Sequence, residues 1–167
     1  MNTLHTRRGF TLIELLIVGL IITILTTVAW TQYNRAIIRA RTSAMFPLLK
    51  NVIDAETMFY LDHGDTTYDL RNLDVNVLNS CQLLRVVACP VDRRKTCTQY
   101  KCGSHFVLDF GVDMFILNYC PHNNNDIARC IAKRDYKIEI PLPPAPRVWR
   151  CTHFSSLGKH ICEKYFK

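Results

Sequence analysis

The sequence predicts an α+β fold in which one long amino-terminal helix packs against a small, disulfide-rich antiparallel sheet. Three observations predict it. The strongest apolar segment of the 167-residue chain lies within its first 30 residues. Apolar residues then continue at helical spacing to about residue 63. All eight cysteines follow residue 80, among short segments with the composition of strands.

Residues 10–30 read FTLIELLIVGLIITILTTVAW and contain a single charged residue, Glu14. As a helix this segment would be about 31 Å long, enough to cross the hydrocarbon core of a membrane. A cleaved secretory signal has a shorter apolar core that ends at small residues. A plain signal anchor would not explain the acid. A carboxylate near the middle of a membrane span costs about 3 kcal/mol, so Glu14 indicates a function that involves a partner.

A short basic leader, residues 1–9, precedes the apolar segment and ends in Arg7, Arg8 and Gly9. Basic residues beside a membrane span tend to stay in the cytoplasm, so we expect the carboxyl-terminal part of the chain to be exported. Three arginines follow the span and weaken this charge asymmetry: Arg35, Arg39 and Arg41. The prediction of orientation therefore depends on the leader, which is the shorter side.

The junction Gly9-Phe10-Thr11-Leu12-Ile13-Glu14 resembles the processing signal of type IV pilins and of the pseudopilins of type II secretion. The resemblance continues through the helix to about Val75. It implies that a prepilin peptidase and N-methyltransferase cleaves between Gly9 and Phe10, on the cytoplasmic face, and methylates the new amino terminus of Phe10. The sequence departs from the family pattern in two respects: Thr31 stands where many pilins carry a proline, and Thr23 stands where a glycine is common.

The resemblance also implies how such a chain is placed and used. The subunit would cross the inner membrane once, with its carboxyl-terminal domain in the periplasm. An inner-membrane assembly platform would then add it to other pilin subunits, in a pilus on the cell surface or in a periplasmic pseudopilus. We expect a pilus subunit that serves adhesion, motility or DNA uptake. The alternative is a pseudopilin of a type II secretion system that acts in protein export.

Glu14 has a chemical role in this scheme that follows from its position. Cleavage before Phe10 would create an ammonium group at the start of an apolar helix, without a partner in its own chain. Glu14 lies about one helical turn further on and can face a neighbouring chain. An ammonium–carboxylate pair between subunits would relieve the desolvation cost of both charges. We therefore predict that Glu14 acts in assembly rather than in catalysis.

Beyond the span, the helix is expected to continue to His63, to loosen at Pro47 and to stop at Gly64. Its second half should be amphipathic, with these residues on the buried stripe: Met45, Leu49, Val52, Ile53, Phe59 and Tyr60. The predicted division of the chain is a leader (1–9), a transmembrane and assembly helix (10–30), an amphipathic helix (31–63) and an exported β-sheet domain (64–167).

Residues 65–79 are polar and predicted to form the loop that joins helix and sheet. Strands are predicted at 105–110, 112–119 and 127–140, with a turn at 121–126 that makes the later two a hairpin. The proline-rich segment 141–146 is expected to be an extended connector, because proline cannot donate to a central strand.

The even number of cysteines in the exported half predicts disulfides, which form in the periplasm or outside the cell. Eight cysteines allow 105 pairings, and Cys97–Cys102 is geometrically feasible as a tight loop. The pilin resemblance implies the pair Cys151–Cys162, which would close a terminal loop. The remaining candidates are Cys81, Cys89, Cys120 and Cys130. No C-x-x-C pair or recognised histidine spacing is present, so no metal site is predicted.

The sequence contains no catalytic motif and no cofactor-binding motif that we recognise, so we expect a protein that is not an enzyme. The basic run Arg93-Arg94-Lys95 has two readings. It is either a solvated loop or a contact for an anionic surface such as DNA, whose affinity would fall steeply with salt.

Overall fold

The computed structural model describes residues 10–73, 75, 81–88, 96–111, 113–121 and 126–166. The chain forms two compact units, Met1–Thr42 and Ser43–Lys167, and each is described by itself. Helix α1 (Leu12–His63) belongs to both, with its apolar half in the first unit and its amphipathic half in the second. The long amino-terminal helix predicted from the sequence is confirmed.

Helix α1 ends where the sequence places its stop signal. Gly64 has a φ of +73°, which an L-residue with a side chain adopts only with strain. Its backbone N–H donates to the carbonyl of Tyr60 at 2.8 Å, which satisfies one of the unpaired carbonyls of the last turn. Pro47 lies inside the helix and does not interrupt it.

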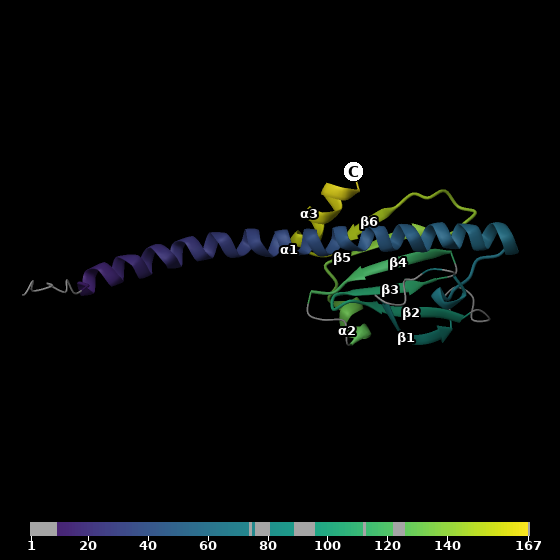
Figure 1. Cartoon of the computed structure of the whole chain (residues 1–167), viewed down its shortest axis with the longest axis horizontal. Helices are drawn as coiled ribbons and strands as arrows, with labels where there is room; N and C mark the ends of the chain where they lie inside the picture. The colour runs from purple at the N-terminus through teal and green to yellow at the C-terminus, as the bar shows by residue number, and fades with distance from the viewer. Residues whose placement is uncertain are drawn as a thin grey trace, which may run out of the picture. The chain divides into compact units, whose positions relative to one another are not determined.

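The second unit contains a six-stranded sheet in which every pair of neighbours is antiparallel and the spatial order is the chain order (Figure 1). Figure 1 also shows the amphipathic half of α1 lying across this sheet. The strands are β1 (Cys81–Ala88), β2 (Thr96–Cys102), β3 (Phe106–Phe110), β4 (Met114–Tyr119), β5 (Tyr136–Pro141) and β6 (Arg150–His153). The predicted α+β fold with an antiparallel sheet is therefore confirmed.

One face of the sheet forms the core. Strand register places Tyr100 opposite Leu108, Leu108 opposite Leu117, and Leu117 opposite Ile138, and all four side chains are buried. A second buried row on the same face runs Phe106, Tyr119 and Tyr136. Within the second unit, the buried residues of α1 are Leu49, Val52, Ile53 and Glu56. The apolar stripe is thus core, as the helical spacing predicts, although Met45, Phe59 and Tyr60 are only partly buried.

The other face of the sheet is more polar and is covered at one end by the short helix α2 (Ile127–Ala132). Buried Val107 and the disulfide Cys120–Cys130 pack together there, with Ile127 against them. Beside this patch the amide of Asn118 donates to the carboxylate of Asp109 at 2.7 Å. Residues of the central strands therefore alternate between an apolar face and a partly polar one.

The carboxyl-terminal segment ends in helix α3 (Ser156–Tyr165), which a disulfide between Cys151 and Cys162 joins to edge strand β6. Gly158 lets this helix approach the sheet, because a Cβ at that position would lie 2.1 Å from the carbonyl oxygen of Asp135. Phe46 of α1 contacts three aromatic rings of this segment: Trp149, Tyr165 and Phe166.

Several local predictions need correction. Residues 127–132 form helix α2 rather than the start of a strand, because the Asp126 side chain caps the helix by accepting from the N–H of Arg129 at 3.1 Å. Cys102 is bonded to Cys81, so the tight loop Cys97–Cys102 does not form. Strands β1, β2 and β6 and helix α3 were not predicted. Val112, at the start of a predicted strand, lies outside the described residues.

Glu56 is a charged residue on the buried face of α1, and its side chain is fully buried. One carboxylate oxygen accepts the backbone N–H of Thr67 at 2.7 Å, and the other is buried without a hydrogen-bond partner. Burial, with a smaller contribution from the charge of Asp65, raises the pKa of Glu56 from 4.5 to about 7. The domain therefore favours the protonated acid.

We expect Glu56→Gln to remove a pH dependence of stability. The folded pKa lies above the unfolded value, so the protein binds a proton on folding between pH 4.5 and 7 and loses stability as the pH rises through that range. Relative to the wild type, the Gln variant should gain up to about 3 kcal/mol across this interval. Urea unfolding at several pH values measures the difference, and a constant difference would contradict the argument.

Candidate functional site

The apolar half of α1 is the part of the molecule that needs a partner. Its large apolar side chains from Phe10 to Val28 are between 46% and 81% exposed. The helix is long and apolar enough to cross a membrane, judged by length and composition, with a mean hydropathy of 2.5 over its most apolar window. Such a surface is stable only in lipid or against other apolar helices.

The threonines of this segment do not present free hydroxyl groups. The hydroxyls of Thr23, Thr26, Thr27 and Thr31 each donate to a carbonyl three or four residues earlier in the same helix, at 2.6–3.0 Å. Bonding of this kind satisfies a hydroxyl without a partner chain. Glu14 is therefore the group of this segment that needs a counter-charge from outside its own helix.

The start of α1 places Glu14 in its first turn, where the N–H of Glu14 donates to the carbonyl of Thr11 at 3.1 Å. Phe10 precedes the helix and its side chain is 74% exposed. A carboxylate in the first turn interacts favourably with the positive end of the helix dipole. Gly9, the other residue of the predicted cleavage junction, lies outside the described residues.

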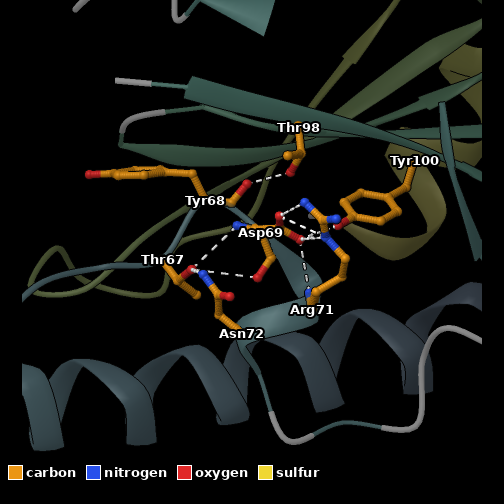
Figure 2. A network of polar contacts seen from close by, with 7 residues as sticks. All are labelled: Thr67, Tyr68, Asp69, Arg71, Asn72, Thr98 and Tyr100. Carbon is orange, nitrogen blue, oxygen red and sulfur yellow. Dashed lines mark hydrogen bonds and ion pairs between the residues drawn. The ribbon is translucent and has the colours of Figure 1, made fainter. Parts of the chain in front are cut away.

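A network of polar contacts fixes the loop that leads from α1 to the sheet (Figure 2). The carboxylate of Asp69 lies between the guanidinium of Arg71 and the hydroxyl of Tyr100 on β2, and accepts hydrogen bonds from both. The same carboxylate accepts the backbone N–H of Arg71 at 2.9 Å, which caps the short helix η1 (Leu70–Asn72). These bonds, those from Arg71 above all, lower the pKa of Asp69 to about 2.

Two further bonds tie the loop to the sheet and to itself. The Thr98 hydroxyl on β2 donates to the carbonyl of Tyr68, and the Asn72 amide donates to the Thr67 hydroxyl at 3.0 Å. Leu70 and Leu73 are buried beneath the network. The sequence predicts only a polar loop here, and the role of Asp69 was not predicted, although an aspartate two residues before Arg71 is a capping signal.

All eight cysteines belong to the second unit, Ser43–Lys167. The described disulfides are Cys81–Cys102, Cys120–Cys130 and Cys151–Cys162, the last being the pair that the family resemblance implied. Cys97 is also disulfide-bonded. Cys89 and the basic run Arg93, Arg94 and Lys95 lie outside the described residues. No group of three or more metal-ligating side chains occurs in the described part of the chain.

Fold and site together define a class of protein. Its members have an exposed apolar helix with a single acid in the first turn, followed by a disulfide-linked sheet domain. Comparison with known proteins specifies the class. Residues 4–30 match the model of the prokaryotic N-terminal methylation motif. The chain is 45% identical over 65 residues to a fimbrial protein of Neisseria meningitidis, which covers 39% of this chain and 37% of that protein.

A similar match is found to the type IV major pilin protein PilE1 of Neisseria gonorrhoeae, 45% identical over 64 residues, or 38% of each chain. The matched segment therefore spans little more than a third of these relatives. No solved structure matches. The methylation motif and these relatives support membership of the type IV pilin family, through the amino-terminal part of the chain.

Asp69→Asn should destabilise the sheet domain by about 1–3 kcal/mol at pH 7, because it leaves Arg71 and Tyr100 with a neutral partner. The folded pKa of Asp69 lies below its ordinary value of 3.8, so its contribution is present above that pH and is lost as the pH falls toward 2. Thermal unfolding at pH 7 and pH 2.5 measures both effects. Asp62→Asn, at a carboxylate that is 80% exposed, is the control and should change stability by less than about 0.5 kcal/mol. Equal effects of the two substitutions would contradict the role of the network.

Proposed function

We propose that this chain is a structural subunit of a type IV pilus, made as a precursor with the leader 1–9. A prepilin peptidase cleaves after Gly9 and methylates Phe10. The subunit then waits in the inner membrane, with residues 10–30 as its span and the domain from residue 64 on the exported side. An assembly platform transfers it into a filament, in which the apolar halves of many α1 helices cover one another.

The observation that carries this proposal is the lone carboxylate of Glu14 in an otherwise apolar, exposed helix segment, within the residues that match the methylation motif. A new ammonium at Phe10 and the carboxylate of Glu14 are the two charges that this surface cannot leave unpaired once it is buried among other helices. A pair between adjacent subunits satisfies both and favours one axial register. The proposal assigns no catalytic role to the chain, in keeping with relatives named as fimbrial and pilin proteins.

A pilus is favoured over a secretion pseudopilus by one observation. The relatives that match are fimbrial and major pilin proteins. The location of the assembled protein separates the two functions: a pilin is recovered in filaments sheared from the cell surface, whereas a pseudopilin stays in the periplasm and its loss blocks the export of other proteins.

Processing can be read from the intact mass of the protein, purified from the membrane and shear fractions of its own host. We expect the chain to lack Met1–Gly9 and to carry one added methyl group. Alkylation before and after reduction should show no free thiol in the unreduced protein. A full-length, unmethylated chain would rule out the pilin function.

Glu14→Ala and Glu14→Gln should both insert into the membrane and remain folded, but enter sheared filaments at least about tenfold less than the wild type, because several kcal/mol of unpaired charge would be buried on assembly. Quantitative immunoblots of membrane and shear fractions measure the ratio. Thr26→Ala is the matched control, since its hydroxyl is bonded within its own helix. Normal incorporation of the Glu14 variants would remove the assembly role of the acid.

A further inference from the structure

The arginines that follow the apolar segment are not used by the proposed assembly scheme. Between Glu14 and Asp54 the chain contains no acidic residue and four basic ones: Arg35, Arg39, Arg41 and Lys50. Cations on the exported side oppose the usual charge rule for membrane insertion. Because these arginines weaken the orientation signal, we expect a different role for them.

An aromatic pair stands just before these arginines. Trp30 and Tyr33 are 63% and 59% exposed, and their ring centroids are 6.5 Å apart. Trp30 closes the 21-residue apolar segment. Aromatic residues with one polar atom are enriched at the level of the lipid headgroups, where the ring is in apolar surroundings and the polar atom is in water. The pair therefore marks the depth at which α1 leaves the hydrocarbon core.

The arginines lie within reach of that level. At about 1.5 Å per residue, Arg35 lies about 8 Å beyond Trp30 along the helix and Arg41 about 17 Å beyond it. Side chains of a helix lean toward its amino terminus, which here is the end inside the membrane. The long side chains of Arg35 and Arg41, both exposed, therefore reach back toward the headgroups.

The arrangement around the helix favours lipid over a protein partner. At about 100° per residue, Arg35 and Arg41 lie about 120° apart around the helix axis, and Arg39, which is half-buried, lies near Arg35. A partner protein would meet cations on a single face. A headgroup layer surrounds the helix and can meet cations on every side.

We propose that Trp30, Tyr33, Arg35 and Arg41 form a binding surface for anionic phospholipid headgroups in the leaflet on the exported side. The phosphates of that leaflet hold the subunit at a fixed depth while it waits in the membrane. Extraction of the subunit toward a filament then breaks these contacts. The inference rests on the membrane span of the proposed function and not on polymerisation.

The test measures which lipids surround Trp30 in the full-length chain, reconstituted in vesicles. Trp149, the other tryptophan, is replaced in every sample by Trp149→Phe, so that fluorescence reports Trp30 alone. Quenching by phosphatidylglycerol or phosphatidylcholine with brominated chains gives the relative affinity of the two lipids. We expect a severalfold preference for phosphatidylglycerol that decreases as the salt concentration rises, since up to about fivefold is attributable to each arginine near the surface.

The variant Arg35→Gln/Arg41→Gln should reduce the preference to about one. The control Lys50→Gln/Lys159→Gln removes the same number of charges, at sites further along α1 and on α3, and should keep it. No preference in the parent chain, a preference insensitive to salt, or equal loss in variant and control would each overturn the proposal. Alkaline extraction tests the span separately: a chain released from the vesicles would contradict the membrane anchor itself.

Discussion

The unpartnered apolar surface of α1 is the constraint on which the rest of the molecule depends. Nothing in its own unit covers the side chains between Phe10 and Val28, so the free energy of the chain is lowest in surroundings that the chain itself does not supply. Lipid and a bundle of like helices are the two such surroundings. A subunit of this kind can pass from one to the other because both are apolar.

The second unit has to stay folded in water. It contains only a short stretch of α1, from Ser43 to His63. The buried face of the amphipathic half is small, and it is completed by aromatic contacts of Phe46 and by the ion pair between Arg147 and Asp54 at 2.8 Å. The loop after α1 is held by Asp69 rather than by apolar burial alone. Polar bonds and disulfides thus supplement the apolar core of this unit.

Sequence reasoning succeeded where one physical signal was strong and repeated. A long apolar run, a 3–4 rhythm and a glycine stop predicted α1 to its last residue, and the junction at Gly9-Phe10 predicted the match to the methylation motif. It failed where short signals competed. Residues 127–132 were read as a strand because Ile127 and Ile131 are apolar and β-branched, yet one capping bond from Asp126 decides for helix. Strand β1 was missed because it is an edge strand whose exposed Leu83 and Val86 give no clean alternation.

In the candidate site, too, some residues could be predicted from the sequence and others could not. Phe10 and Glu14 are recognisable because they stand at fixed places in a motif. The contacts of Asp69 depend on Tyr100, which is 31 residues away in sequence and is brought near only by the sheet. Cysteine pairing is likewise a property of the strand register, since Cys81 and Cys102 are opposite each other on β1 and β2. No arrangement of residue types along the chain carries that information.

The meander order of the sheet has a consequence for how the domain acquires its covalent form. Each strand pairs with the one before it, and the described disulfides join cysteines only 10, 11 and 21 residues apart. Contacts so local need little loop closure and form quickly. In the export that we propose, the amino terminus stays on the cytoplasmic side and the strands emerge in order from β1 to β6, so the domain can fold strand by strand. Cys151 and Cys162 are the described bonded pair that emerges last, so their bond requires that almost the whole chain has crossed the membrane.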